Sequence, residues 1–424
     1  MNRAMKDSGI DWIGEIPMDW DILRGKTVFS QRNSKGNHEL RLLSATQKQG
    51  MLPQDLLEGV VLTSENTDLS TFKTVHKNDF VISLRSFQGG FEKSNYEGVC
   101  SPAYQVFYNR VPIHHNFFWL LFKSLGFIDK INSLTVGIRE GKNILYKDFS
   151  NMLLAVPPVA EQEAIAAFLD RKCGEVDEMV SLQEQVIEEL KAYKQSVITE
   201  AVTKGLNPTA PMKPSNIDWI GQIPTHWEIL RLKQIVQVPL QYGANESGVL
   251  FDEKLPRYVR ITDIFNNTLK EDIVKLSLTE EQAAPYILND GDILFARSGG
   301  TVGKTFIYRN KYGRCAFAGY LIKANIADEH CAQYIYYYTL SFCYDEWKNQ
   351  VFIQSTIQNI GADKYSVLPI TVPPLQEQRE IADYLGRKCA DIDALIALKQ
   401  QKIEELKQYK KSLIYEYVTG KKQV

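Results

Sequence analysis

The side chains of this chain that could recognise another molecule lie on short polar loops that follow apolar, strand-like runs. Residues 44–50 place hydroxyl, amide and ammonium groups together after such a run. Glutamine can bind adenine through two hydrogen bonds, and lysine or arginine can reach guanine or a phosphate oxygen. A solvated loop has a similar composition, so both interpretations stay open. The candidate contacts are Thr46, Gln47, Lys48, Arg85, Gln88, Arg139 and Lys142 in the first half, and Arg260, Thr262, Arg297, Thr301, Lys304 and Gln358 in the second.

Two of these candidates, Arg85 and Arg297, each follow a strand-like run at matching places in the two halves. A residue shared by otherwise unlike halves suits a common task, such as gripping a phosphate backbone, better than reading different bases. An ion pair inside each domain is the alternative. Asn143 and Asn359 are also matched, and asparagine at such a position equally suits a turn or a cap.

The motifs of catalysis are missing from the sequence. A DNA amino-methyltransferase needs an Asn/Asp-Pro-Pro-aromatic motif and a glycine-rich cofactor loop, whereas the two Pro-Pro pairs here follow Val156 and Val372. The six histidines show no metal-ligand spacing, and no carboxylate cluster of a nuclease can be singled out. We therefore expect no catalytic residue, no metal and no cofactor.

One loop partly fits the nucleotide-binding pattern G-x-x-x-x-G-K-[ST]. Gly303, Lys304 and Thr305 match its end, but Ser298 stands where the first glycine belongs. A lysine beside glycines serves a DNA phosphate equally well, so we expect no nucleotide site here.

Two sequence motifs that flank these loops each occur twice in the chain. Asp-Trp-Ile-Gly-x-Ile-Pro stands at residues 11–17 and again at 218–224, and Pro-Pro-x-x-Glu-Gln stands at 157–162 and again at 373–378. The offsets are 207 and 216 residues, so the interior of the second copy is nine residues longer. A period of this length indicates domain duplication rather than a stacked repeat array.

Both copies of the Pro-Pro-x-x-Glu-Gln motif begin a helical stretch. In each stretch, apolar residues recur at alternating spacings of three and four and form a seam along the helix. Such a seam predicts a partner helix, and each copy can supply the partner of the other. We expect the first stretch to break near Cys173 and Gly174, which leaves long helices over about 175–203 and 391–418. The seam positions are Val180, Gln183, Ile187, Leu190, Lys194, Val197 and Ala201 in the first copy, and Ile396, Lys399, Ile403, Leu406, Lys410, Leu413 and Tyr417 in the second.

The interiors, which are the segments between the two motifs of each copy, have a different sequence pattern. They contain short strand-like runs and single helices over about 115–131 and 331–347. The expected fold is therefore α+β, with two mixed α/β recognition domains separated by two long antiparallel coiled-coil-like helices in a pseudo-two-fold internal repeat. The expected domains are 1–156 (recognition), 157–206 (helical spacer), 207–372 (recognition) and 373–424 (helical spacer).

Composition places few further limits on function. The chain has 424 residues, 44% hydrophobic and 24% charged, with a formal net charge of −2. This charge argues against a simple nucleic-acid coat, and the two interiors are only mildly basic or neutral. No apolar run is long enough to span a membrane, and the six cysteines lack metal or disulfide spacing, so we expect a cytoplasmic protein.

With these motifs in view, the chain resembles the specificity subunits of type I restriction–modification enzymes. The two repeated phrases carry the resemblance, together with Ala-Val-Thr-Lys-Gly-Leu at residues 201–206 and the partial match Tyr-Val-Thr-Gly at 417–420. The resemblance implies that each interior is a target-recognition domain for one half of a split site in double-stranded DNA. It also implies two methyltransferase (modification) subunits as partners, with restriction (translocase and nuclease) subunits joining through the complex.

Two other classes of function stay open at this point. The chain could be a protein scaffold that does not itself read DNA, or a nucleotide-hydrolysing enzyme that uses the loop around Lys304. DNA binding with a steep salt dependence would separate the first of these from a DNA reader, because phosphate contacts release counterions. A nucleotide-dependent shift in melting temperature would support the second.

Overall fold

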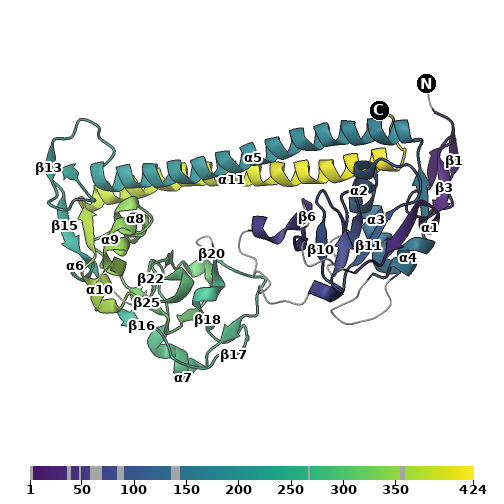
Figure 1. Ribbon diagram of the computed structural model, residues 1–424. Helices are drawn as coiled ribbons and strands as arrows, with labels where there is room; N and C mark the ends of the chain where they lie inside the picture. Colours follow the sequence, from purple (N-terminus) through teal and green to yellow (C-terminus); the bar gives the residue numbers. More distant parts are fainter. Residues whose placement is uncertain are drawn as a thin grey trace. The chain divides into compact units, whose positions relative to one another are not determined.

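The computed structural model describes residues 3–35, 40–46, 49–57, 69–83, 90–134, 144–265, 268–353 and 359–424. The chain divides into two compact units, Met1–Glu184 with Gln401–Val424, and Gln185–Gln400. Both units combine helices and strands, as expected for an α+β fold (Figure 1). Among the described residues, no helix is long and apolar enough to cross a membrane.

The first unit is built around a four-stranded antiparallel sheet in the order β4-β11-β8-β9. Its core is a phenylalanine cluster centred on Phe29, whose ring lies 5.2–5.8 Å from five neighbouring phenylalanine rings. The strands are β1 (Met5–Asp7), β2 (Glu15–Pro17), β3 (Asp21–Arg24), β4 (Phe29–Arg32), β5 (Leu43–Thr46), β6 (Gly50–Pro53), β7 (Lys73–Val75), β8 (Phe80–Ile82), β9 (Phe91–Lys93), β10 (Gly98–Cys100), β11 (Gln105–Asn109) and β12 (Leu153–Val156). The short helices are α1 (Gly25–Val28), α2 (His115–Lys123), α3 (Leu125–Ser133) and α4 (Tyr146–Asn151), with 3-10 turns η1 (Gln54–Leu56) and η2 (Leu69–Thr71).

The second unit repeats this plan around a four-stranded antiparallel sheet in the order β16-β25-β22-β23. The strands are β13 (Met212–Pro214), β14 (Gln222–Pro224), β15 (Glu228–Arg231), β16 (Gln241–Tyr242), β17 (Val249–Leu250), β18 (Arg257–Val259), β19 (Ile264–Phe265), β20 (Thr268–Leu269), β21 (Leu276–Ser277), β22 (Ile293–Ala296), β23 (Thr305–Ile307), β24 (Cys315–Phe317), β25 (Leu321–Ala324) and β26 (Pro369–Val372). The short helices are α6 (Leu232–Ile235), α7 (Glu280–Ala283), α8 (Ala332–Tyr338), α9 (Phe342–Ile353) and α10 (Ala362–Ser366), with 3-10 turns η4 (Ile261–Asp263), η5 (Ala284–Tyr286), η6 (Gly299–Thr301) and η7 (Asn310–Tyr312).

The smaller sheets of the two units correspond in part. Strands β1 and β2 pair in the first unit as β13 and β14 do in the second, and β12 pairs with β3 as β26 pairs with β15. A parallel bridge joins Leu42 to Val99, where the second unit has the parallel pair β18 and β24. The remaining strands differ: the first unit has two two-stranded sheets, whereas the second has one four-stranded sheet, β17-β21-β18-β24, and one two-stranded sheet, β19-β20.

The expected single helix in each interior is wrong, because each is two helices. Ser124 lies between α2 and α3, and its hydroxyl donates to the carbonyl of Leu121 at 2.7 Å. Ser341 precedes α9, and its hydroxyl donates to the carbonyl of Tyr338 at 2.7 Å. A serine that bonds back to the preceding turn competes with the helical hydrogen bonds and ends the first helix.

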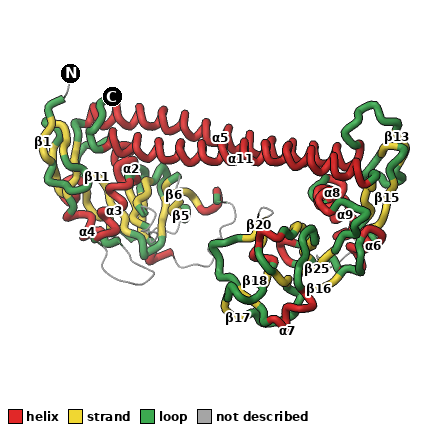
Figure 2. Tube along the Cα trace, turned by 180° about the vertical axis from the view of Figure 1, so that it is seen from behind, coloured by secondary structure: helices red, strands yellow, loops and turns green. Residues whose placement is uncertain are grey.

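The long helices are α5 (Val159–Lys204) and α11 (Leu375–Val418), and both are unbroken (Figure 2). The break expected near Cys173 and Gly174 is therefore wrong. A lone glycine lowers helix stability by only about 1 kcal/mol, and buried seam residues on both sides offset this. Cys173 itself is buried, at 8% exposed, as a small apolar side chain.

The two long helices run antiparallel inside each unit. In the first unit Asp177 accepts two hydrogen bonds from the Lys410 ammonium at 2.6 and 2.7 Å, and in the second Asp393 accepts two from Lys194 at 2.7 Å. All fourteen seam positions predicted from the sequence are buried or half-buried. Because the two ion pairs are repeats of one pair at an offset of 216 residues, the same helix register is marked in both units.

Replacement of Gly174 by alanine should stabilise the protein, because the glycine is exposed and a Cβ there would meet no atom within 4 Å. We expect a gain in unfolding free energy of about 0.5–1 kcal/mol, measured by chemical denaturation. A control is Gly50→Ala, which should destabilise, since Gly50 has φ +76° and a Cβ would lie 2.2 Å from the Lys93 carbonyl oxygen. If Gly174→Ala lowers stability, the helix is not continuous in solution.

Candidate nucleic-acid interface

The turn between β22 and β23 gathers three of the residues predicted to contact DNA: Arg297, Thr301 and Lys304. It is closed tightly, because the Ala296 N–H donates to the Lys304 carbonyl at 2.8 Å and the Gly303 N–H donates back to Ala296 at 2.9 Å. Gly303 has φ +79°, and a Cβ there would lie 2.3 Å from the Lys348 side chain. Glycine is therefore favoured here by the left-handed backbone conformation. The result is a compact loop, residues 297–304, that we call the β22–β23 loop.

Arg297 is placed at the start of this loop by its backbone. Its N–H donates to the Tyr320 carbonyl at 3.1 Å, and its own carbonyl accepts from the Ile360 N–H at 2.9 Å. The guanidinium carbon lies 4.9 Å from the centre of the Tyr242 ring. Among the residues that the structure describes, no carboxylate pairs with Arg297, and its buried Nε has no hydrogen-bond partner. A guanidinium held on an aromatic face without an anion is suited to receive one.

The β22–β23 loop presents further polar groups at the surface. Lys304 is exposed, and no ion pair to it is found in the described part of the chain. Ser298 forms a strand bridge with the exposed Asn359, which brings that asparagine beside the loop. Gln358, the neighbouring predicted contact, lies outside the described residues.

The loop does not have the topology of a nucleotide-binding loop. Such a loop leads from a strand into a helix whose N-terminus faces the phosphates. Here Lys304 leads directly into β23, which pairs antiparallel with β22. The residues around Lys304 thus lack the helix that the nucleotide-hydrolysing alternative needs.

Arg260 and Thr262 belong to another part of the second unit. The Arg260 guanidinium forms an ion pair with Asp263 at 3.0 Å and donates to the Val274 carbonyl at 2.9 Å. Asp263 is fully buried and also accepts from the Arg260 N–H and the Thr262 hydroxyl. These contacts fix the turn after β18, so the structure gives both predicted residues a local structural role.

In the first unit only Thr46 of the predicted contacts is described. Its hydroxyl donates to the Gly50 carbonyl at 2.8 Å and accepts from the Gln49 N–H at 3.1 Å, so it closes the turn between β5 and β6. The other six predictions, Gln47, Lys48, Arg85, Gln88, Arg139 and Lys142, lie outside the described residues, as does Asn143.

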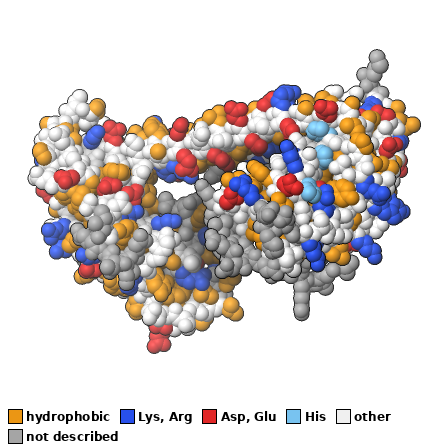
Figure 3. All heavy atoms as spheres, in the orientation of Figure 1, with side chains coloured by type: hydrophobic (Ala, Val, Ile, Leu, Met, Phe, Trp, Pro, Cys, Tyr) orange, Lys and Arg blue, Asp and Glu red, His pale blue; other side chains and the backbone are white. Residues whose placement is uncertain are grey.

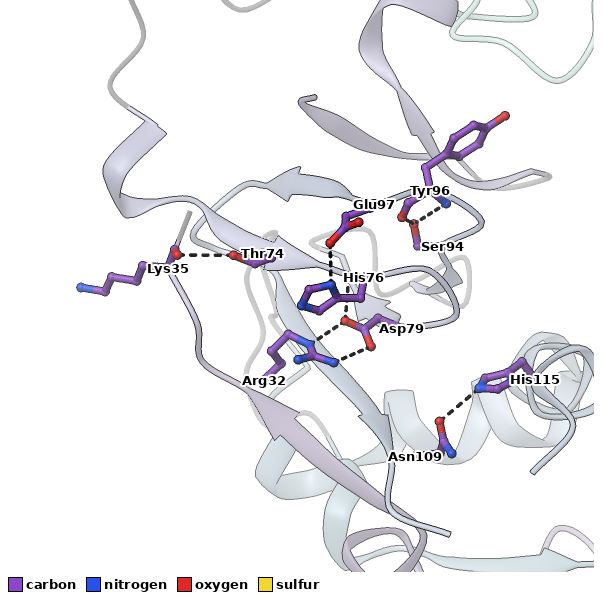
Figure 4. A network of polar contacts seen from close by, with 10 residues as sticks. All are labelled: Arg32, Lys35, Thr74, His76, Asp79, Ser94, Tyr96, Glu97, Asn109 and His115. Carbon is purple, nitrogen blue, oxygen red and sulfur yellow. Dashed lines mark hydrogen bonds and ion pairs between the residues drawn. The ribbon is translucent and has the colours of Figure 1, made fainter. Parts of the chain in front are cut away.

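The strand before Arg85 is nevertheless well fixed (Figure 4). Asp79, 3% exposed, accepts from the Arg32 guanidinium at 2.7 Å and from the His76 N–H at 2.9 Å. His76 in turn lies 2.8 Å from the exposed Glu97 carboxylate. In the second unit the buried Asp292 accepts from the Asn289 N–H in the same way, at 2.8 Å.

Counting from these two aspartates relates the two strands. Arg85 follows Asp79 by six residues, whereas Arg297 follows Asp292 by five. The described register ends at Ser83, which aligns with Ala296. Arg85 lies outside the described residues, so the equivalence predicted for Arg85 and Arg297 stays a prediction.

Two aromatic residues beside Arg297 were missed from the sequence. Tyr242 is 41% exposed and Tyr320 is 64% exposed. Exposed aromatic rings next to cations are a frequent feature of nucleic-acid surfaces. The two tyrosines stand 55 and 23 residues from Arg297 in the sequence, so only the pairing of β25 with β16 and β22 brings them together.

The charge distribution shows no single basic patch on the described part of the face in Figure 3, where Lys and Arg side chains alternate with acidic ones. Among the described residues, no group of three or more His, Cys, Asp or Glu side chains could hold a metal ion.

Comparisons with known proteins find similar proteins of one kind. Residues 224–408 match the family model described as the type I restriction modification DNA specificity domain. The chain is 25% identical over 290 residues to the type I restriction enzyme MjaVIII specificity subunit of Methanocaldococcus jannaschii, a match that covers 65% of this chain and 63% of that protein. It is 26% identical over 283 residues to the EcoKI specificity subunit of Escherichia coli, covering 64% and 58%. Both matches span less than two thirds of the relative.

Solved structures show the same fold. One chain from a structure of the assembly and conformational transition of the type I R-M system aligns with a TM-score of 0.70 at 16% identity, covering 95% of this chain and 98% of that one. The HsdS subunit from Thermoanaerobacter tengcongensis aligns with a TM-score of 0.51 at 17% identity, covering 96% and 98%. The family resemblance predicted from the sequence is confirmed.

Replacement of Arg260 by alanine should destabilise the second unit, because Asp263 stays buried and loses its cation. We expect a loss on the order of 1–3 kcal/mol in unfolding free energy, measured by denaturant titration. Arg297→Ala is the matched control and should change stability much less, since no described carboxylate depends on it. Equal losses in the two variants would contradict this assignment of roles.

Proposed function

We propose that this chain, a type I restriction–modification specificity subunit by family, reads an asymmetric, bipartite site in double-stranded DNA. Residues 1–156 and 207–372 each read one half of the site, and residues 157–206 and 373–424 form the helical spacers between them. The chain does no chemistry itself. It positions two methyltransferase subunits and, through them, the restriction subunits, in the cytoplasm.

One observation carries this proposal: the two units share the same structural framework, whereas the loops with the candidate contacts differ between them. Gln162 and Gln378 are both 1% exposed and make the same two contacts in the two units. Each donates to the carbonyl of the first proline of its motif and accepts from the N–H of the residue before α2 or α8. The central sheets have the same strand order. The loops that carry the candidate contacts differ in sequence and in length.

Such a frame suits a split DNA site. Two related domains joined by antiparallel helices acquire a pseudo-two-fold axis and meet a duplex in opposite orientations. For domains on one face of B-DNA, the half-sites are then about one helical turn, roughly 34–36 Å, apart. The coiled-coil seam and the paired ions Asp177–Lys410 and Lys194–Asp393 support a helical spacer of fixed register.

The structural support for contacts to DNA is strongest for the β22–β23 loop. Arg297 and Lys304 lie within eight residues of each other and have no described anionic partner, and Thr301 lies between them. Unpaired cations on a closed loop suit phosphate oxygens, whereas the neighbouring hydroxyl and amide groups suit base edges. Gln47, Lys48, Arg85, Gln88, Arg139, Lys142 and Gln358 stay proposed contacts on the grounds of their sequence.

Exchange of residues 27–156 for the corresponding interior of another specificity subunit should change only one half of the recognised site. The site is mapped by long-read detection of methylated bases in cells that make the chain with its modification subunits. The unchanged half and the unchanged spacing serve as the internal control. If both halves change, or if the spacing changes, the domains are not independent readers.

Replacement of Arg297 or Lys304 by alanine should weaken DNA binding of the assembled complex for all sequences alike. Each lost phosphate contact lowers the slope of log K against log salt by about one. The measurement is a salt series of equilibrium binding to matched and unmatched duplexes. Lys204→Ala, at the end of α5, is the control and should leave the slope unchanged. Altered base preference at an unchanged slope would instead assign the residue to base reading, and a scaffold protein would show no salt-dependent binding at all.

A further inference from the structure

Two buried tyrosines hold the two ends of the β22–β23 loop. The Tyr365 hydroxyl donates to the Ala296 carbonyl at 2.8 Å, and the Tyr344 hydroxyl donates to the Gly303 carbonyl at 2.8 Å. Both side chains are fully buried, at less than 2% exposed. Burial raises the pKa of both phenols well above the ordinary value, so each hydroxyl stays protonated and acts as a donor.

These hydroxyls add to a loop that already closes on its own backbone. The Ala296 carbonyl accepts from the Gly303 N–H as well as from Tyr365. Tyr344 belongs to α9 and Tyr365 to α10, so two helices from a different part of the sequence donate hydrogen bonds to the backbone at this loop. The two phenol rings also pack in the core, where the Phe295 ring lies 4.7 Å from that of Tyr365 and 6.5 Å from that of Tyr344.

The first unit lacks both hydroxyls at the corresponding positions. His114 and Cys331 donate to the same glutamine of the repeated motif, and counting from them aligns Tyr344 with Phe127. The carbonyls of Met152 and Leu368 accept equivalent hydrogen bonds from Gly25 and Leu232.

Counting from Leu368 and Met152 aligns Tyr365 with Phe149. Phe127 and Phe149 are both fully buried, so each aligned position holds a buried ring in both units, and only the second unit has the hydroxyls. The chain therefore contains its own comparison of the fold with and without these two donors.

We propose that Tyr344 and Tyr365 are positioning residues that hold the β22–β23 loop in a single conformation, so that the second domain reads its half-site with a preformed loop. This inference rests on the proposed function, and it assigns the device to the second domain only. A loop fixed before binding loses less conformational entropy when it binds and holds its side chains in the productive geometry. Neither tyrosine contacts DNA, and both act through Arg297, Thr301 and Lys304.

The test is the double variant Tyr344→Phe/Tyr365→Phe in the full chain. Phenylalanine occupies both aligned positions in the first unit, so the packing is preserved and only two hydroxyls are lost. The control is Tyr334→Phe, because Tyr334 is equally buried, aligns with Phe117, and donates to the Thr371 carbonyl at 2.9 Å instead of to the loop.

Two measurements are made on each variant. Hydrogen exchange of the Val302, Gly303 and Lys304 amides in the full chain should accelerate on the order of ten-fold in the double variant and stay unchanged in the control. In the assembled complex, discrimination between the mapped site and duplexes mismatched in the second half should fall on the order of ten-fold. Discrimination at the first half and the salt slope should not change.

The outcomes separate this inference from the proposed function. Unchanged exchange in the loop, or an equal loss of discrimination in both halves, overturns the positioning role. Faster exchange with full discrimination at the second half shows that the hydroxyls serve the loop but not recognition, and also overturns it. A wild-type complex without salt-dependent DNA binding overturns the proposed function, and with it any role of these tyrosines in reading DNA.

Discussion

A buried glutamine at the start of each long helix is the contact on which each unit depends. Gln162 and Gln378 are almost inaccessible to solvent, so every polar atom of the amide has to find a partner inside the protein. Each donates to the carbonyl of the proline five residues earlier and accepts from the N–H of the residue before α2 or α8. The direction of the long helix and the position of that interior helix are thus set by one side chain in each unit. This is the physical reason why the Pro-Pro-x-x-Glu-Gln phrase occurs twice with so little change.

The glutamate beside each glutamine has different partners in the two units. Glu161 accepts from the Trp20 indole at 3.0 Å and pairs with Arg3, whereas Glu377 lies 2.8 Å from the His226 ring. Both contacts attach the leading segment of the unit to its long helix, but through different donors. Trp20 and Trp227 are equally buried, yet the Trp227 indole N–H has no partner among the described residues. The frame therefore keeps the carboxylate and the packing of the ring, while the hydrogen-bond donor is free to differ.

The sequence predicted the parts of this protein that are repeated, and it failed where geometry decides. The repeated motifs predicted the family resemblance, and the three-and-four spacing located seam residues that are buried or half-buried in the structure. The sequence did not show that the helix continues through Gly174. A single glycine lowers helix stability only slightly, and the burial of neighbouring side chains outweighs this loss. The sequence also missed the ends of α2 and α8, where one serine hydroxyl competes with the backbone.

The candidate contacts depend on still finer geometry. Arg260 and Arg297 look alike in sequence, since both follow a strand, yet one neutralises a buried aspartate and the other rests on a tyrosine ring. The difference between the two interiors follows from the same kind of constraint. A phenylalanine core, as around Phe29, packs against any backbone of suitable shape, because it makes no directional demand. A buried tyrosine needs an acceptor, so a tyrosine core commits the nearby backbone to particular carbonyl positions. Duplicated domains that exchange one ring for the other can keep the same fold while one of them gains two further hydrogen bonds to the backbone of a surface loop.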